Sequence, residues 1–322
     1  MPQSLPKVVF LDKATIPAHA LFRELSFPHQ WVEYDFTSPE QLEERLVGAE
    51  IVISNKVVLS GETLRQFPDI KLIAVSATGT NTIDLDYCAE NQIAVCNIQG
   101  YATRSVPEHV IGMIFALKRN LFAYHQDIEK GVWQKDKQFC FFTHPISDVA
   151  GSTIAIIGSG SLGQAVATLA SALSMKPIFV ERKGATQVRE GYVSFEEALQ
   201  QADIVTLHCP LTQSTTHLIA RDELALMKST SVLINTGRGG LVDETHLVEA
   251  LKSGDIAGAG VDVFTQEPAD TSNPLLANMS LPNLLLTPHV AWGSDSALQS
   301  LVDILLNNID DFVAGKHSNR VV

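Results

Sequence analysis

The sequence predicts an α/β fold with two units, each a parallel sheet covered by helices on both of its faces. Short runs rich in Val and Ile alternate with amphipathic segments along most of the 322 residues, and this alternation is typical of β-α-β units. One long helical segment and a polar, aromatic loop interrupt the alternation near the middle, after which it starts again. A chain of this length corresponds to about two domains at roughly 150 residues each, so the interruption marks the change from one unit to the next.

The first hundred residues are expected to form strands and helices in turn. Buried strands are short and rich in β-branched residues, and five such segments occur at 8–12, 31–35, 51–54, 72–78 and 94–98. The amphipathic segments between them predict helices at 17–25, 38–49, 61–67 and 83–91. The second of these helices has a recognisable start, because Ser38 suits the N-cap and Pro39 suits the first helical position.

The rest of the chain repeats the alternation after a helical stretch at 106–131 and a loop at 132–150. A helix near 102–120 is expected to link the two units. A last helix is predicted at 294–314, ending at Gly315, and the pattern alone does not assign it to either unit. Six further strands are predicted at 153–157, 177–181, 203–208, 231–236, 259–264 and 283–289.

The composition narrows the class of function. The chain has 23 Lys and Arg against 36 Asp and Glu, a formal net charge of −13. This charge argues against binding nucleic acids or anionic membranes. It does not exclude a local basic cleft that binds a small anion. Four cysteines without a C-x-x-C pair indicate a reduced, cytoplasmic location. The first apolar run is too short for a signal peptide and no 18-residue apolar stretch occurs, so neither export nor a membrane span is expected.

A glycine-rich turn follows the strand at 153–157 and opens an amphipathic helix. The pattern G-x-G-x-x-G is weak evidence alone, but between a strand and a helix it predicts a dinucleotide site. The first glycine permits a tight turn, the second lets the backbone approach a pyrophosphate, and the third lets the helix pack on the sheet. The positive end of the helix then binds the phosphates. The residues concerned are Gly158, Ser159, Gly160, Ser161, Leu162 and Gly163.

An acidic residue lies where the ribose of such a dinucleotide is expected. Glu181 ends the next predicted strand, and a carboxylate about 20 residues past the glycines accepts ribose hydroxyls and repels a 2′-phosphate. Arg182 and Lys183 follow directly, and such cations can bind that phosphate. We therefore predict NAD as the cofactor, with a modest preference over NADP, and the two cations keep NADP open.

Three polar side chains follow three successive predicted strands of the second unit. They are Arg238, Glu267 and His289. Ligands of open α/β sheets bind outside the carboxyl ends of the strands, so we expect these side chains to converge on one site. Each residue type has an ordinary alternative: a surface ion pair for the arginine, an exposed turn for the glutamate, and a buried, hydrogen-bonded ring for the histidine.

The three residue types together suit the reduction of a carbonyl group. Arg238 offers a fork to a carboxylate and a neighbouring carbonyl oxygen. His289 in its protonated form can donate a proton as a hydride reaches the carbonyl carbon, and Glu267 can orient the imidazole and favour its charged form. The hydride comes from the cofactor. No metal is needed, because the arginine and the imidazolium supply the positive charge.

In this order and spacing, the motifs GSGSLG, HCPLT, NTGRGGLVDE, GVDVFTQEP and TPHVAW resemble the D-isomer-specific 2-hydroxyacid dehydrogenases. The resemblance covers nearly the whole chain. It implies a flavodoxin-like, substrate-binding domain made from both chain ends, 1–101 and 294–322, with a Rossmann-like dinucleotide-binding domain, 102–293, inserted into it. It also implies that the three polar residues are the catalytic set, that the last helix belongs to the first domain, and that the protein is a homodimer paired through the cofactor domains.

The same resemblance implies further contacts. The backbone N–H groups of Gly79 and Thr80, helped by Thr78, would bind the substrate carboxylate. Trp292 would line the substrate pocket. Asp262 would bind the nicotinamide carboxamide. Other cofactor contacts are implied for Thr103, Val106, His208, Cys209, Pro210, Thr236 and Gly237.

Three segments are similar to glycerate dehydrogenases, also called hydroxypyruvate reductases: 53–59, the aromatic loop from Trp133 to Phe142, and Trp292. This similarity implies a small 2-keto acid such as hydroxypyruvate or glyoxylate as substrate. The family usually has Asp at the ribose position, from which Glu181 departs. Two other classes stay open: a non-catalytic, NAD-sensing corepressor of the same fold, against which the lack of long tails weighs, and a formate- or phosphite-oxidising enzyme. The acid at Glu267 fits formate oxidation poorly, because formate enzymes carry an amide there.

Overall fold

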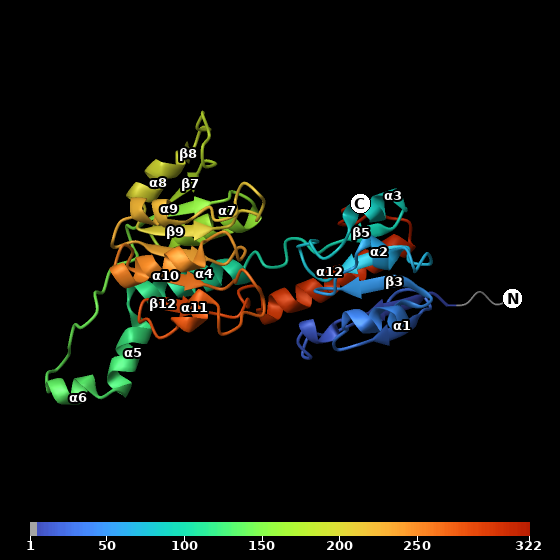
Figure 1. Ribbon diagram of the computed structural model, residues 1–322, viewed down its shortest axis with the longest axis horizontal. Helices are drawn as coiled ribbons and strands as arrows, with labels where there is room; N and C mark the ends of the chain where they lie inside the picture. Colours follow the sequence, from blue (N-terminus) through green and yellow to red (C-terminus); the bar gives the residue numbers. More distant parts are fainter. Residues whose placement is uncertain (1–4) are drawn as a thin grey trace. The chain divides into compact units, whose positions relative to one another are not determined.

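The computed structural model describes residues 5–322 and divides the chain into two compact units (Figure 1). Unit 1 contains the chain up to Tyr101 together with Gly293–Val322, and unit 2 is Ala102–Trp292. The predicted domain ranges differ from these units only at Gly293, which the structure places in unit 1.

Unit 1 is built on a five-stranded parallel sheet with the strand order β2-β1-β3-β4-β5. This is the flavodoxin-like order. The inner strands are mostly buried because Val, Ile, Leu, Phe and Ala make up most of their residues, as a sheet covered on both faces requires. The strands are β1 (Lys7–Phe10), β2 (Gln30–Glu33), β3 (Ala49–Ser54), β4 (Leu72–Val75) and β5 (Ala94–Cys96).

The last helix, α12 (Asp295–Val313), belongs to unit 1 and packs on β4. Asn308 of this helix donates from its side chain to the Asn97 carbonyl at 2.9 Å, and Val321 beyond it donates its N–H to the Val95 carbonyl at 2.7 Å. The end of the chain is therefore tied to the first sheet. The shorter helices are η1 (Lys13–Thr15), η2 (Pro39–Gln41), α1 (Leu42–Leu46), α2 (Gly61–Leu64) and α3 (Leu85–Glu90).

The helix predicted at 17–25 is wrong, because this segment forms a turn and irregular backbone. Several of its polar groups bond to α12. Leu21 donates its N–H to the Gln299 side chain at 3.0 Å, and the Arg23 guanidinium lies 2.8 Å from the carboxylate of Asp310. These contacts with a distant helix replace local helical bonds, so the amphipathic pattern is overridden by tertiary structure.

Unit 2 contains a seven-stranded parallel sheet with the order β12-β11-β10-β9-β6-β7-β8. Counted from β6, this is the Rossmann order with a seventh strand added. The order reverses between β6 and β9, and ligands of open α/β sheets bind in the crevice at such a point. The strands are β6 (Thr153–Ile157), β7 (Lys176–Val180), β8 (Tyr192–Val193), β9 (Ile204–Leu207), β10 (Val232–Asn235), β11 (Gly258–Val261) and β12 (Leu284–Leu286).

Helices cover both faces of the second sheet. On one face, α4 (Ser105–Lys118) packs on β10 and β11, and α7 (Ser161–Ala172) packs on β6 and β7. Further helices share an apolar core with the sheet. These are α8 (Phe195–Gln201), α9 (Arg221–Leu226), α10 (Glu244–Ser253) and α11 (Pro274–Ala277). Within residues 5–322, no helix is both long and apolar enough to cross a membrane.

The long helix predicted at 106–131 is interrupted. Asn120 has a φ of 49°, in the left-handed region, and separates α4 from α5 (Leu121–Glu129). A further short helix, α6 (Val132–Asp136), lies in the segment predicted as loop. Figure 1 shows α5, α6 and the segment after them extending away from the sheet of unit 2.

Candidate active site

The glycine-rich turn connects β6 to α7, and its three glycines shape it. Gly158 has a φ of +107°, and a Cβ there would lie 2.5 Å from the carbonyl carbon of His208. A Cβ on Gly163 would lie 2.0 Å from the carbonyl oxygen of Gly158, so α7 approaches the turn too closely for a side chain. By contrast, no atom lies within 4 Å of the Cβ position of Gly160. The second glycine therefore leaves open space beside the start of α7.

This open space and nearby polar groups fit a bound dinucleotide. Gly160 is the N-cap of α7, and no side chain caps this helix start, so its first N–H groups are available to phosphate. In the described part of the chain, His208 Nδ1 and Thr236 Oγ1 are buried without a hydrogen-bond partner. His208 follows β9 and donates its backbone N–H to Ile157 beside the glycine turn at 2.7 Å. Burial lowers the pKa of the His208 ring to about 4, so the ring is neutral near pH 7.

The glycines allow a prediction that separates folding from cofactor binding. Gly160→Ala should leave the melting temperature unchanged, because space surrounds its Cβ, but it should weaken NADH binding at least tenfold by filling the phosphate approach. Gly163→Ala, by contrast, should lower the free energy of unfolding by about 1–3 kcal/mol, because its Cβ collides with backbone. Calorimetry for stability and titration of NADH for binding would check both. Normal NADH affinity in Gly160→Ala would exclude this turn as the phosphate site.

Glu181 follows β7 and is almost fully buried, with both carboxylate oxygens hydrogen bonded. Arg189 donates from Nε to Oε2 at 2.6 Å and from Nη2 to Oε1 at 2.9 Å. The backbone N–H groups of Arg182 and Arg189 add two more bonds. These bonds, above all those from the Arg189 side chain, lower the pKa of Glu181 to about 2. Lys183 lies 2.7 Å from Glu223. The carboxylate predicted to face a ribose is thus held by an arginine of its own loop.

Glu267 and His289 form a hydrogen-bonded pair beyond the ends of β11 and β12. His289 Nδ1 lies 2.6 Å from Glu267 Oε2, and both side chains are partly exposed. Glu267 Oε1 accepts the N–H of Phe264 at 2.9 Å, which fixes the carboxylate. Because Nδ1 is engaged with the carboxylate, Nε2 is the ring nitrogen that can exchange a proton with a substrate.

Asp262 anchors the turn that carries His289. Its carboxylate is fully buried and accepts the N–H of Val290 at 2.9 Å, the N–H of Ala291 at 3.0 Å and the hydroxyl of Thr287 at 2.5 Å. Its backbone carbonyl accepts the N–H of His289 at 2.7 Å. These bonds hold His289 at a φ of 56°. A residue expected to bind the nicotinamide carboxamide therefore also supports the histidine.

Arg238 lies on the exposed turn after β10. The Asn235 side chain ties this turn by donating to the Arg238 carbonyl at 3.0 Å and accepting the Gly237 N–H at 3.1 Å. A Cβ on Gly239 would lie 1.8 Å from the Phe264 carbonyl oxygen. The arginine turn is thus in direct contact with the segment that leads to Glu267. The structure brings the three predicted catalytic residues to the same edge of one sheet.

The other predicted contacts are divided between the two units. Trp292 donates its indole N–H to the His289 carbonyl at 2.8 Å, so the ring braces the histidine turn. Thr78 is in unit 1, in the loop after β4, and its hydroxyl donates to the Ile98 carbonyl at 2.7 Å. Gly79 and Thr80 lie in the same loop as Thr78. Thr103 lies in the turn before α4, and Val106 lies in the first turn of that helix. Ser161 and Leu162 begin α7, and Cys209 and Pro210 follow His208.

Sequence reasoning missed two groups that the structure adds. Arg189 lies in the loop that follows Glu181, and Tyr192 begins the next strand, β8. In the sequence, Arg189 is recognisable only as one more cation in this loop. His109 of α4 places Nε2 3.0 Å from the Thr287 hydroxyl and 3.8 Å from Asp262, below the histidine turn. No local pattern marks that histidine, because its partners are far away in the sequence.

Comparisons with known proteins agree with this geometry. Residues 111–291 match the model of the NAD binding domain of D-isomer specific 2-hydroxyacid dehydrogenases. The chain is 49% identical to a glycerate dehydrogenase of Methylorubrum extorquens, over 98% of this chain and 98% of that protein. It is 34% identical to a hydroxypyruvate reductase of Blautia hydrogenotrophica, over 98% and 99% of the two chains.

A solved structure has the same fold. The D-lactate dehydrogenase of Aquifex aeolicus, complexed with NAD and lactic acid, superimposes with a TM-score of 0.82 at 27% identity. The similarity covers 98% of this chain and 99% of that one. Both units therefore have counterparts in that protein.

Proposed function

The chain belongs to the family of D-isomer specific 2-hydroxyacid dehydrogenases, and we propose that it is a glycerate dehydrogenase, which interconverts D-glycerate and hydroxypyruvate. As a member of this family it is an oxidoreductase that transfers a hydride between NAD(P) and a 2-hydroxy acid. The observation that carries the proposal is the pair of Glu267 and His289, 2.6 Å apart in the unit that contains the glycine turn. The 49% identity to a glycerate dehydrogenase supports the choice of substrate.

The three residues at the sheet edge have complementary roles in the reduction. When bound, the nicotinamide supplies the hydride. His289 donates the proton of Nε2 to the carbonyl oxygen, and in the reverse direction it accepts the hydroxyl proton. Glu267 holds the ring in one orientation and favours its charged form. Arg238 presents its fork to the substrate carboxylate and carbonyl oxygen, where it stabilises the developing negative charge.

We assign recognition of the substrate carboxylate also to the loop of Thr78, Gly79 and Thr80 in unit 1. The loop is held in shape from within that unit, because the Asn97 side chain donates to the Thr78 carbonyl at 2.8 Å. Since the Thr78 hydroxyl is bonded to backbone, the backbone N–H groups of Gly79 and Thr80 are the donors suited to an anion.

The substrate is tested by kcat/KM for hydroxypyruvate, glyoxylate and pyruvate, each with NADH and NADPH. We expect hydroxypyruvate to be used best, with glyoxylate second. A highest value for pyruvate would assign a different 2-hydroxy acid to the same site. A chain that binds NADH but turns over none of the three would act as a nucleotide sensor of the same fold.

Removal of the charge on Glu267 should change the pH dependence of the reaction. Glu267→Gln removes the anion that stabilises the protonated His289 ring during the reaction. Reduction needs the protonated ring, and the high-pH limb of kcat/KM for reduction should therefore move to lower pH. The profile measured between pH 5 and 9 would check this. An unchanged profile would show that the pair does not control proton donation.

The coenzyme preference is expected to be modest. We propose that NADH is preferred over NADPH by roughly tenfold in kcat/KM, or about 1.4 kcal/mol, because the Glu181 carboxylate disfavours a 2′-phosphate while cations surround it. Glu181→Ser should relax or invert the preference. A wild-type enzyme that uses NADPH better than NADH would contradict this expectation.

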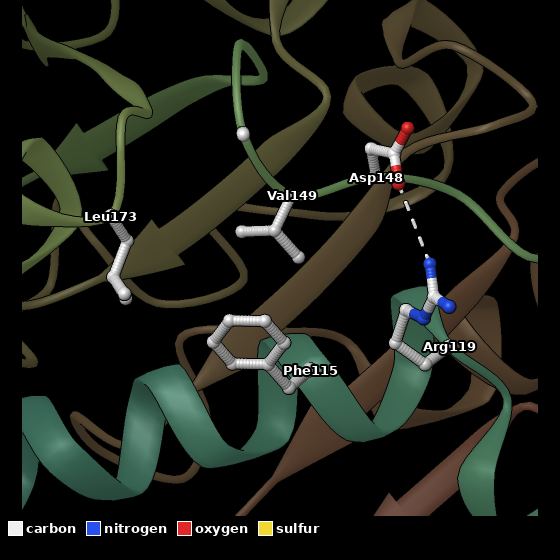
Figure 2. A pocket seen from close by; sticks show the side chains of 6 residues that line it. Phe115, Arg119, Asp148, Val149 and Leu173 are labelled. Carbon is white, nitrogen blue, oxygen red and sulfur yellow. Dashed lines mark hydrogen bonds and ion pairs between the residues drawn. The ribbon is translucent and has the colours of Figure 1, made fainter.

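We also propose that the protein is a homodimer paired through unit 2. The segment from α5 to residue 146 exposes Phe122, Trp133, Phe139 and Phe142, of which Phe139 is 94% exposed. We call this segment, residues 121–146, the arm. Several large exposed apolar side chains on one segment are typical of surfaces that bind a partner. At the base of this arm, Phe115 and Leu173 line a cavity of about 340 Å³ that is bordered by the Arg119–Asp148 ion pair (Figure 2).

Sedimentation measurements test this assembly. The wild type should sediment at twice the mass of one chain. Phe139→Ser with Phe142→Ser should produce monomers, because both side chains project from the arm. A monomeric wild type would refute the homodimer.

We place the protein in the cytoplasm, where thiols stay reduced. All four cysteines are free in the described structure, and two of them, Cys88 and Cys96, are buried. Burial, together with the Asp84 carboxylate, raises the pKa of the Cys88 thiol to about 11, which makes that thiol unreactive. Fractionation of cells that express the chain would check the location.

A further inference from the structure

A network of side chains connects the end of β7 with the glycine turn. Arg189 reaches back to Glu181 with two hydrogen bonds from its guanidinium. The same guanidinium stacks on Tyr192, with its central carbon 3.8 Å from the ring centre. The Tyr192 hydroxyl donates to Ser159 Oγ at 2.7 Å. Arg189 is therefore held in one place, beside the turn that fits the coenzyme phosphates.

The Arg189 guanidinium has more hydrogen-bond donors than Glu181 accepts. It carries five N–H groups, and Nε and Nη2 each direct one of them to Glu181. Among residues 5–322 the side chain bonds to no other acceptor. It is 53% exposed, whereas the Glu181 side chain is 5% exposed. The outer edge of a fixed guanidinium thus faces solvent beside the carboxylate that follows β7.

We propose that Arg189 binds the 2′-phosphate of NADP(H), and that Glu181 is the positioning residue that holds the guanidinium for it. The inference rests on the proposed function only in that the glycine turn must bind a dinucleotide. An arginine fork matches the geometry of a phosphate. The ion pair also offsets part of the Glu181 charge, which is why the expected preference for NADH is only modest. Lys183 is the weaker candidate, because it is already paired with Glu223.

Substitution of Arg189 and substitution of Glu181 should have opposite effects on the affinity for NADP(H) relative to NAD(H). Without Arg189, the buried carboxylate is exposed to the 2′-phosphate and repels it. Without the charge of Glu181, the guanidinium is no longer neutralised and attracts the phosphate more strongly. A merely structural ion pair would instead affect both coenzymes equally, because loss of either partner would loosen the same loop.

Calorimetric titration with adenosine 5′-monophosphate and with adenosine 2′,5′-bisphosphate measures this site without catalysis. Arg189→Met should weaken the bisphosphate at least tenfold and the monophosphate less than twofold. Glu181→Gln should strengthen the bisphosphate about threefold relative to the monophosphate. Lys176→Met is the matched control, because it removes an exposed cation at the opposite end of β7, and it should change neither affinity by more than twofold. If Arg189→Met fails to fold, Arg189→Lys keeps the charge without the fork and should lose part of the discrimination.

The outcomes separate this inference from the proposed function. An unchanged ratio of the two affinities in a folded Arg189 variant overturns the role of Arg189, whatever substrate the enzyme reduces. Equal weakening of both ligands by the Arg189 and Glu181 variants also overturns it, in favour of a structural pair. A wild type that binds neither ligand overturns the coenzyme site itself. Failure to reduce hydroxypyruvate, with the expected titrations intact, would refute only the choice of substrate.

Discussion

Replacement of Arg238 by alanine is expected to lower kcat/KM for hydroxypyruvate by about 10²–10⁴-fold, or about 3–5 kcal/mol. The guanidinium is the one side chain of the catalytic set that can grip the carboxylate and the carbonyl oxygen together, and charged bidentate contacts are strong. KM should rise because the carboxylate contact is lost in the ground state. The value of kcat should also fall, because the charge on the oxygen grows in the transition state.

Two further variants make this result specific. Arg238→Lys keeps the charge but not the fork, so its loss should lie between wild type and alanine. Arg221→Ala removes an exposed arginine that is paired with Glu249 in the same unit, and it should change kcat/KM by less than twofold. Near-normal kinetics of Arg238→Ala would remove Arg238 from the site.

The features that could be predicted from the sequence are those set by neighbouring residues. Most strands of both units are short apolar runs, and both sheets are parallel as predicted. Strand β2 is the exception in unit 1, because it is half polar and only partly buried. The predicted ribose carboxylate, Glu181, directly follows its strand. Strand β8 has two residues, too few to carry an alternating pattern. The tight contacts of Gly158 and Gly163 have the steric causes that the motif predicts.

Contacts between distant residues could not be predicted in this way. The segment at 17–25 has a helical pattern, yet its bonds to Gln299 and Asp310 decide its conformation. Arg189 returns to Glu181 only because the loop between them folds back, and the sequence marks it merely as one more cation. The sequence therefore predicts the carboxylate that follows β7, but it does not predict the arginine that pairs with this carboxylate.

Replacement of His289 is expected to abolish most of kcat while NADH still binds. His289→Gln removes the ring nitrogen that donates the proton, and loss of a general acid costs about 10²–10⁴-fold in rate. NADH affinity, measured by fluorescence titration, should stay within about threefold of wild type, because the phosphate contacts belong to the glycine turn. His217→Gln, which changes an exposed histidine of the same unit, should leave kcat unchanged.

The backbone of His289 determines which second variant is needed. Its φ of 56° is left-handed, and Asn tolerates this conformation better than most residues. His289→Asn should therefore keep the turn on Asp262 and Trp292 intact while it removes the proton donor, so it should lose as much kcat as the glutamine variant. If the asparagine variant keeps near-normal kcat, the histidine acts only through its backbone. If both variants lose NADH binding in parallel with kcat, the turn supports the cofactor site, and the proton donor is a different residue.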